Sequence, residues 1–575
     1  MTRKNLYKAL IAVPVVMGMQ SCINLKAGES DGQEAFEYRS IYLPNFDDDE
    51  NEELKLSSLD DTWGLWGHNL SSVLPDNASK QVYAKVNGAI NADQFCFSSE
   101  KLYDYIVDYV NANYIFEDSV KFAILPNDNG LVCLCSECVR AGNTKGNTSP
   151  TVFNLIEKLA NKFPEHQFFT SYYHTTQELP DRPMPTNAGV WVSSMHYPFS
   201  AAETHQEREF IYLLQRWGRV TDKVYVWDYI NNFDDYFTPI PLFTIMQRRF
   251  KHYRDAGVNG VFLNGSGNDY STFWRLKKAV LAHMLQNPDI DWEETLRKYA
   301  AKYYPVAGND IADFIVAQER MVAEKGKRLP YYGGVETAIR TYLPEQEFVE
   351  FYNKIVQHKK VATGQEKEDL ENMTDAMALT MLEIKRINNN LEDTGKLKER
   401  LARLPKKDIN FYNEGCWSID RYLKNYEFME QDAMETASTN LLKDVKLKEI
   451  TPLDEDYPDI RIVTDGQLGI PSNYHNGNLI SSADPELKIG IPRVPGMSRL
   501  KVWMVYNPGF KIGLPDEVSI KVDGVKRGTQ VPEKPQGGTG HSFVEFDIPP
   551  HGDIVLSLRK NPEIKTMAID EIQAF

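Results

Sequence analysis

The sequence predicts an α/β protein with three parts: a (β/α)8 barrel of distorted form, a helical domain and a C-terminal β-sandwich. Short β-rich runs alternate with amphipathic helical runs over 36–286, which is typical of βα units around a parallel sheet. Charged helical periodicity follows over 292–442, and short strands separated by Gly, Pro and Asp turns follow after residue 451. We therefore expect a barrel at 36–290, a helical domain at 291–450 and a β-sandwich at 451–575.

Eight runs are candidate barrel strands, and eight is the number that closes a (β/α)8 barrel. The segments between the first three runs are short or irregular, which favours a distorted barrel over a regular one. A doubly wound open sheet is the alternative. The eight runs are 38–43, 62–67, 94–98, 121–126, 167–173, 189–194, 223–230 and 260–264.

Helices are marked by proline at their starts and by apolar residues at helical spacing. Pro150 opens one helix, and another begins at Pro241 and ends at Gly257, a common C-terminal breaker. Beyond the barrel, 367–390 is a long helical run. The clearest sandwich strands are 500–506, 518–522, 543–548 and 554–558.

The N-terminus has the order of a secretion signal: basic residues, an apolar run at 10–19 and a small-residue site before Cys22. We expect a lipoprotein signal peptide at 1–21, acylation of Cys22 and a flexible tether at 22–35. The apolar run is too short to span a bilayer. A buried N-terminal helix is the alternative, but it leaves the basic flank and the cysteine unexplained. The expected location is the cell envelope, on the periplasmic or the cell-surface face of the outer membrane.

Composition excludes some partners and permits others. The formal net charge of −17 disfavours binding to nucleic acid or to anionic lipid headgroups. An aromatic content of 11% is compatible with faces that stack on sugar rings, although cores also use aromatic residues. The expected partners are a glycan and, through the Cys22 lipid, a membrane.

Cysteines cluster at one place in the expected barrel. Cys133, Cys135 and Cys138 form a Cys-x-Cys-x-x-Cys run, and Cys96 lies upstream. In an exported protein, clustered thiols form disulfides by default. Four thiolates can also complete a closed tetrahedral zinc site. Both interpretations stay open, and in either one the cluster fixes a loop; no cofactor is required for chemistry.

Function in a (β/α)8 barrel belongs at the C-terminal ends of the strands. Asp128 and Asp228 are the carboxylates placed directly at such ends, and glycoside cleavage uses a carboxylate pair. We expect Asp128 to be the general acid and Asp228 the base or nucleophile. A turn role for Asp128 and a buried structural role for Asp228 are the alternatives. The expected substrate-binding residues are Trp66, His68, Asn127, Tyr173, His174, His196, Trp227, Tyr229 and Asn264.

The joint order of four motifs resembles an uncharacterised family, domain of unknown function 4838, over about 36–306. That family is common in lipoproteins of gut Bacteroidetes and is similar to α-glucuronidases and hexosaminidase-like glycosidases with a (β/α)8 barrel. The resemblance implies work on carbohydrate. The motifs are Trp63-Gly64-Leu65-Trp66-Gly67-His68, Asp128 with the cysteine run, Val226-Trp227-Asp228-Tyr229, and Gly257-Val258-Asn259-Gly260-Val261-Phe262.

The sequence departs from this family at the eighth strand, and its C-terminal part resembles a different kind of domain. Relatives commonly show a Phe-x-Glu-Gly ending at the eighth strand, whereas this sequence has Asn264, which cannot act as acid or base. The C-terminal part resembles galactose-binding-like sandwiches, through Thr464-Asp465-Gly466 and Ile569-Asp570-Glu571-Ile572. Such pairs can hold Ca²⁺, and a purely structural sandwich is the alternative.

The leading hypothesis is a glycoside hydrolase-like lipoprotein that acts on polysaccharide or oligosaccharide fragments. The competing hypothesis is a non-catalytic carbohydrate-binding lipoprotein on a degenerate barrel, which Asn264 favours. A structural envelope protein without a ligand is the third.

Overall fold

The computed structural model describes residues 34–44, 52–114, 117, 119–326, 328–388, 390–436, 439–454, 459–469, 471, 480–482, 484–562, 564 and 566–575. The expected signal peptide, Cys22 and the tether up to residue 33 lie outside the described residues. Residues 35–575 form one unit, so the expected boundaries inside it stay predictions.

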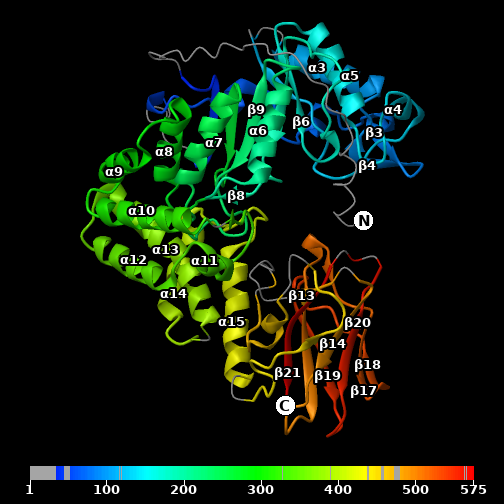
Figure 1. Ribbon diagram of the computed structural model, residues 1–575, viewed down its shortest axis with the longest axis vertical. Helices are drawn as coiled ribbons and strands as arrows, with labels where there is room; N and C mark the ends of the chain where they lie inside the picture. The colour runs from blue at the N-terminus through cyan, green and yellow to red at the C-terminus, as the bar shows by residue number, and fades with distance from the viewer. Residues whose placement is uncertain are drawn as a thin grey trace, which may run out of the picture. The chain divides into compact units, whose positions relative to one another are not determined.

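A curled parallel sheet of seven strands carries the first part of the chain (Figure 1). Its order is β1-β10-β9-β7-β6-β5-β2, and every neighbouring pair is parallel. The first strand lies beside the last, which is the order of a barrel and not of a doubly wound sheet. The strands are β1 (Tyr38–Tyr42), β2 (Trp63–Leu65), β5 (Lys121–Ala123), β6 (Gln167–Tyr172), β7 (Ala188–Ser193), β9 (Val224–Tyr229) and β10 (Gly260–Asn264).

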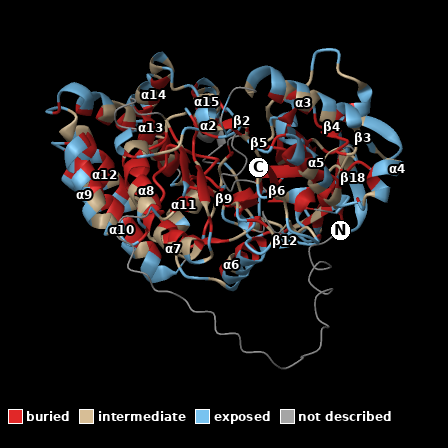
Figure 2. Cartoon of the chain, turned by 90° about the horizontal axis from the view of Figure 1, so that it is seen from above, coloured by how far each residue is buried: buried red, intermediate tan, exposed pale blue. Residues whose placement is uncertain are grey.

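Aromatic rings fill the inside of this sheet. Tyr38 of β1 and Trp63 of β2, at the two ends of the strand order, contact edge to face with ring centroids 5.9 Å apart. Space is tight, since a Cβ on Gly189 would lie 2.4 Å from the ring of Phe169. Helices cover the outside and turn exposed residues outward (Figure 2). They are α3 (Glu100–Tyr114), α5 (Ser149–Lys162), α6 (His205–Trp217), α7 (Phe243–Asp255) and α8 (Trp274–Gln286).

The expected third barrel strand, 94–98, is not part of the sheet. Its first residues belong to β4 (Ala89–Phe95), which pairs antiparallel with β3 (Tyr83–Val86) in a separate hairpin. Asn87 and Gly88 join the two strands with positive φ values of 50° and 84°, as a tight hairpin turn requires. Strand β2 therefore pairs directly with β5, and where eight barrel strands were expected the structure has a curled parallel sheet of seven.

Helices dominate the middle of the chain, as expected. The long run at 367–390 corresponds to α13, which lies in a layer with α10, α12 and α14 (Figure 1). The helices are α9 (Trp292–Tyr303), α10 (Gly308–Lys325), α11 (Val335–Thr341), α12 (Glu345–His358), α13 (Gly364–Ile387), α14 (Gly395–Leu401) and α15 (Ile419–Thr436). A short strand, β11 (Arg328–Leu329), pairs antiparallel with β8 (Phe199–Ser200) and so ties this region to the barrel region.

Two sheets share one apolar core at the C-terminus, which gives the expected sandwich architecture, and their strands pair antiparallel apart from the parallel pair β16–β21. The four clearest predicted strands fall on β15, β17, β19 and β20. The first sheet contains β12 (Lys448–Glu449), β14 (Glu486–Ile491), β20 (Ile554–Arg559), β17 (Glu517–Val522) and β18 (Val525–Gln530). The second contains β13 (Ile480–Ser481), β21 (Thr566–Ala574), β15 (Arg499–Tyr506), β19 (Gly540–Asp547) and β16 (Ile512–Gly513).

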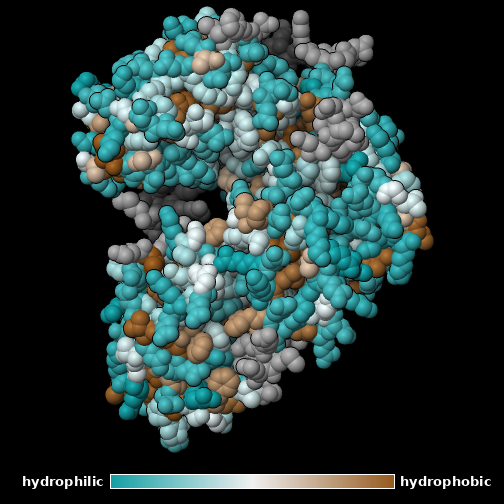
Figure 3. Space-filling model, turned by 180° about the vertical axis from the view of Figure 1, so that it is seen from behind, coloured by the Kyte–Doolittle hydropathy of each residue, from teal (hydrophilic) through white to brown (hydrophobic). Residues whose placement is uncertain are grey.

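The outer surface is mainly polar. Hydrophilic side chains dominate the face drawn in Figure 3, and hydrophobic ones are scattered among them. Among the described helices, none has the length and apolar character needed to cross a bilayer.

Candidate functional site

A cavity of about 290 Å³ opens at the C-terminal ends of the parallel strands. Six strands or the segments that follow them supply most of its lining, because the carboxyl ends of parallel strands meet on one side of the sheet. Two lining residues come from the helical region. The lining residues are His68, Leu125, Asp128, Ser171, Tyr173, Trp191, Ser193, Met195, Trp227, Tyr229, Asn264, Tyr332 and Glu414.

Asp128 lies on the turn after β5, and 56% of its side chain is exposed. Nε2 of His174 lies 3.0 Å from its Oδ1. Hydrogen bonding from His174 is the main reason that the pKa of Asp128 is lowered, with further help from the nearby His68 and Tyr173. A carboxyl group that ionises this readily is a poor general acid at neutral pH, and it suits a base or nucleophile. The expected acid role for Asp128 therefore does not fit its surroundings.

The backbone at His174 is in the left-handed region, with φ of 46°. A non-glycine residue rarely adopts this conformation, and the surrounding structure has to hold it there. Its ring lies against that of Tyr173, with centroids 4.0 Å apart. Backbone strain of this kind is common at functional sites. Here the strained conformation places the imidazole of His174 beside the carboxyl group of Asp128.

Hydrogen bonds to strand β4 fix the turn that carries Asp128. Side-chain amides of Asn127 and Asn129 both donate to the backbone oxygen of Asp93, at 3.0 and 2.8 Å. Gln94 donates to the backbone oxygen of Asn127 and to Oδ1 of Asn129, and it accepts from the N–H of Asn127. Asn127 thus positions the turn. Its expected role in substrate binding would place it in the cavity lining, and it is not there.

Glu414 is the second carboxylate at this cavity, and the sequence interpretation missed it. Glu414 lies in a loop between α14 and α15 of the helical region, and the residue is exposed. Its carboxyl group accepts a 3.0 Å hydrogen bond from Tyr332 Oη. Lost hydration of the carboxyl raises the pKa of Glu414; the Tyr332 bond opposes this rise and the charge of Asp128 adds to it. Asp128 and Glu414 are thus driven in opposite directions, one toward the ionised form and one toward the protonated form.

Aromatic rings form the walls of the cavity. The rings of Tyr173 and His196 are stacked, with centroids 5.8 Å apart, and Trp191 contacts Trp227 edge to face at 5.2 Å. His68 donates from Nδ1 to the backbone oxygen of Pro126 at 2.6 Å, which orients its ring. Flat apolar surfaces beside fixed polar groups are suited to binding the faces and hydroxyls of a sugar.

Five of the nine expected substrate-binding residues line the cavity, and four take other positions. The five are His68, Tyr173, Trp227, Tyr229 and Asn264, which ends β10. His174 contacts Asp128 and His196 stacks on Tyr173, so both support lining residues. Trp66 packs edge to face against Tyr42, at 5.5 Å, outside the lining.

Asp228 is not at the cavity, and its expected role as the second carboxylate is corrected by its burial. It is 0% exposed, and Oδ1 accepts from Arg249 at 2.6 Å and from Ser194 at 2.5 Å. Oδ2 accepts from Tyr253 Oη at 2.6 Å. Alternation along β9 explains the position: Trp227 faces the interior, so the next residue faces the covering helices. Asp228 is the buried structural carboxylate of the alternative interpretation.

A cluster of four cysteines lies near the Asp128 turn. The sulfur atoms of Cys96, Cys133, Cys135 and Cys138 all lie within 4.8 Å of one another, and together they could hold a metal ion. In the described part of the chain, this is the one group of His, Cys, Asp or Glu side chains placed to do so.

Two of the expected Ca²⁺ ligands of the sandwich, Asp570 and Glu571, accept hydrogen bonds within it. Asp570 accepts from the N–H of Gly469 at 2.9 Å, and its other oxygen lies 2.6 Å from His541 Nε2. Glu571 accepts from the N–H of Gly466 at 3.2 Å. These contacts link the last strand of the sandwich to neighbouring segments, and the expected Ca²⁺ site stays a prediction.

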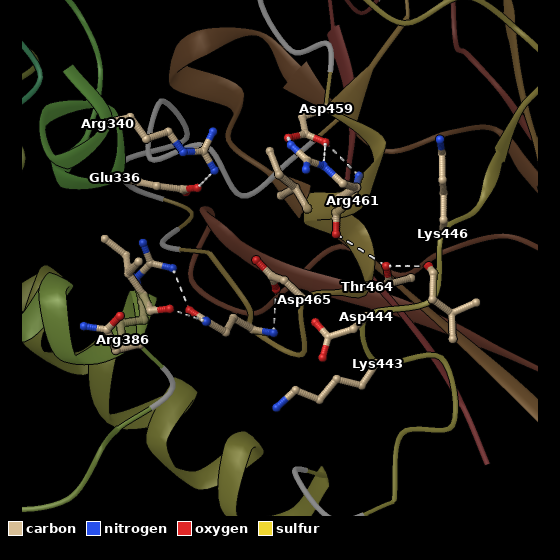
Figure 4. A pocket seen from close by; sticks show the side chains of 15 residues that line it. Glu336, Arg340, Arg386, Lys443, Asp444, Lys446, Asp459, Arg461, Thr464 and Asp465 are labelled. Carbon is tan, nitrogen blue, oxygen red and sulfur yellow. Dashed lines mark hydrogen bonds and ion pairs between the residues drawn. The ribbon is translucent and has the colours of Figure 1, made fainter.

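A second cavity, of about 550 Å³, is lined by α11, the end of α13 and the segment 443–467 (Figure 4). Two ion pairs lie in its lining, between Glu336 and Arg340 and, at 2.6 Å, between Asp459 and Arg461. The described residues of its lining include no aromatic ring. Because this second cavity offers no aromatic stacking surface among its described lining residues, the cavity at the strand ends is the better candidate for a sugar.

The sequence profile of one protein family, described as "Domain of unknown function (DUF4838)", matches residues 26–316. The chain belongs to this family. The matched range contains Asp128 and the four cysteines, and it ends before Tyr332 and Glu414. No curated protein matches the chain.

Several solved structures are similar to the chain at low identity. One is a family GH115 4-O-methyl-α-glucuronidase with specificity for decorated arabinogalactans, at 11% identity over 83% of this chain and 67% of that chain, with a TM-score of 0.33. Another is a GH138 enzyme targeting pectin rhamnogalacturonan II, at 8% identity over 82% and 76%, with a TM-score of 0.28. A Streptococcus pneumoniae fucose-binding module matches 24% of this chain and 97% of its own at 14% identity, with a TM-score of 0.18. At these TM-scores the likenesses decide neither fold nor activity.

Proposed function

We propose that this chain is an envelope-anchored glycoside hydrolase-like protein that acts on polysaccharide or oligosaccharide fragments. The observation that carries the proposal is the presence of two carboxylates, Asp128 and Glu414, at one aromatic-lined cavity. Glycosidases place a carboxyl pair on either side of the bond they cleave. The cavity also lies at the strand ends where barrel enzymes carry out their chemistry.

The two carboxyl groups have separate roles in this proposal. Glu414, whose pKa is raised, is the general acid and donates a proton to the oxygen of the leaving sugar. Asp128, whose pKa is lowered, is ionised and either attacks the anomeric carbon or takes a proton from the attacking water. The configuration of the released sugar distinguishes these two routes.

Binding of the sugar is assigned to the remaining lining residues. The rings of Tyr173, Trp227 and Tyr229 offer apolar surface to a pyranose face. His68 and Asn264 offer polar atoms for hydroxyl groups.

The envelope location rests on the sequence of the N-terminus. The signal at 1–21 would direct export, and lipid on Cys22 would hold the chain to the membrane. Both faces of the outer membrane are compatible with this sequence.

A second candidate function, carbohydrate binding without turnover, is favoured by one observation. Asn264 lines the cavity at the end of β10, and an amide cannot transfer a proton in the way a carboxyl group can. In this version the barrel holds a glycan and the lipoprotein presents it at the envelope.

One experiment separates the two candidates. The purified chain is incubated with a panel of glycans, and binding and product release are both measured for the wild type, Asp128→Asn and Glu414→Gln. Asp76→Asn and Glu399→Gln, at exposed positions away from the cavity, are the matched controls. We expect release by the wild type and the controls and a loss of at least about 100-fold in the two site variants.

Binding that persists in every variant, with no release by the wild type, selects the binding function. Release that Asp128→Asn and Glu414→Gln leave unchanged would overturn the assignment of this carboxylate pair.

A further inference from the structure

The cysteine cluster has the dimensions of a four-sulfur metal site. Sγ of Cys96 lies 3.7 Å from that of Cys135 and 3.6 Å from that of Cys138. In a tetrahedral zinc site with Zn–S bonds of about 2.3 Å, neighbouring sulfurs are about 3.8 Å apart. A disulfide needs sulfurs separated by about 2.0 Å, so these two pairs are spaced for a shared ion and not for a bond to each other.

The backbone around the cluster supports sulfur in its anionic form. The N–H of Lys85 donates to Sγ of Cys133 at 3.2 Å, and the N–H of Cys138 donates to Sγ of Cys135 at 3.5 Å. Backbone donors that point at sulfur stabilise thiolate charge and orient the ligand. Cys133 and Cys138 are 1% and 0% exposed, so an ion held there would be shielded from water.

We propose that Cys96, Cys133, Cys135 and Cys138 bind one Zn²⁺ as a structural site. Four sulfur ligands fill the tetrahedral shell, which leaves no position for water or substrate. The ion therefore has no catalytic role, and it replaces the core that this small hairpin lacks. The local apolar cluster here consists of Ala84 and the cysteines, with Val86 packed against them.

The zinc site also holds the turn that carries Asp128. Cys96 directly follows β4, and the β4 residues Asp93 and Gln94 make all the hydrogen bonds to Asn127 and Asn129 described above. Cys133 lies on the other side of the same turn. The end of β4 and the segment that follows the Asp128 turn therefore both meet at the ion. The effect of the ion on activity rests on the proposed function of Asp128.

The test measures metal directly and does not depend on activity. Elemental analysis of the purified whole chain should give about one zinc per molecule, the content of a single four-cysteine site. Cys133→Ser and Cys138→Ser should lose the zinc, whereas Cys416→Ser, at an exposed cysteine outside the cluster, should keep it.

Because the two cluster variants could fail to fold, the wild type supplies a second measurement. Replacement of zinc by Co²⁺ should produce the intense sulfur-to-cobalt charge-transfer bands of a tetrahedral thiolate site. Absence of metal from the wild type, together with disulfides that join these cysteines in peptide mapping, would overturn the proposal. Zinc retained by both cluster variants would overturn it as well.

If zinc is present and no glycan is cleaved, the metal site stands and the proposed function fails. If glycan is cleaved by a chain without metal, the reverse holds.

Discussion

At the scale of single residues, the hydroxyl of Tyr332 controls the proposed acid. Its hydrogen bond to Glu414 favours the ionised carboxylate and so lowers a pKa that burial raises. Tyr332→Phe should therefore raise the pKa of Glu414 further. Since the acid must be protonated to act, the alkaline limb of the pH–activity profile should move to higher pH.

The acidic limb, which Asp128 sets, should stay where it is in this variant. The profile of kcat/KM against pH, recorded for wild type and Tyr332→Phe, gives both limbs. A shift of the alkaline limb to lower pH would contradict the assignment of Glu414 as the acid.

The buried ion pair of Asp228 and Arg249 makes a prediction about stability. The two side chains are 0% and 3% exposed and lie 2.6 Å apart. Arg249→Met leaves a buried carboxylate without its charge partner and should lower the free energy of unfolding by about 3–5 kcal/mol. The double variant Arg249→Met/Asp228→Asn should recover part of this loss. Urea denaturation of the two single variants and the double variant measures the coupling, and strictly additive losses would show that the pair is not coupled.

The sequence could predict the residues of the site that follow strands, and it could not predict the others. Asp128, Tyr173 and Asn264 were found because strand ends in such a sheet meet at one side. The prediction that Asp228 lies at the site is wrong. Side chains alternate along a strand, so Asp228 cannot face the interior together with its neighbour Trp227. Glu414 lies in a loop of the helical region, far along the chain, and no local pattern connects that loop to the barrel.

At the scale of elements, helix α7 depends on a carboxylate supplied by another helix. Glu319 of α10 accepts from the N–H groups of Leu242, Phe243 and Thr244, at 2.6, 2.7 and 3.0 Å. These donors begin α7 and have no partner within the helix. Glu319→Ala should cost about 2–4 kcal/mol, because it leaves buried N–H groups without an acceptor.

Glu319→Gln keeps one acceptor oxygen and should cost less than the alanine variant. Glu324→Ala, at an exposed position on the same helix, is the control and should change the free energy of unfolding by less than about 0.5 kcal/mol. Chemical denaturation measures all three. Equal losses for Glu319→Ala and Glu324→Ala would show that the cap contributes nothing.

Element type was predicted well from the sequence wherever period and length agreed. The expected strands at 189–194 and 260–264 lie within two residues of β7 and β10. The expected strand at 94–98 failed because a β-rich run alone does not reveal its partner. Asn87-Gly88 before it was the missed signal, since this dipeptide favours a tight hairpin and hence antiparallel pairing with the preceding strand.

At the scale of the whole molecule, the proposed attachment to a membrane rests on the N-terminal lipid. The net charge of −17 opposes binding to anionic headgroups. Acyl chains on Cys22 would supply the missing affinity, and stable anchoring takes more than one chain. The wild type should therefore partition into the detergent phase, and Cys22→Ala should move to the aqueous phase.

Cys416→Ala is the control, since it removes a cysteine from the folded body and should leave the chain in the detergent phase. Mass measurement of the wild-type N-terminal peptide should show acyl chains on Cys22. If Cys22→Ala stays in the detergent phase and the wild-type peptide carries no lipid, the anchor assignment is wrong. Protease treatment of intact cells then assigns the membrane face. Digestion of the wild type places the protein at the cell surface, where polymeric glycans arrive. Protection places it in the periplasm, where only fragments small enough to be imported can reach Asp128 and Glu414.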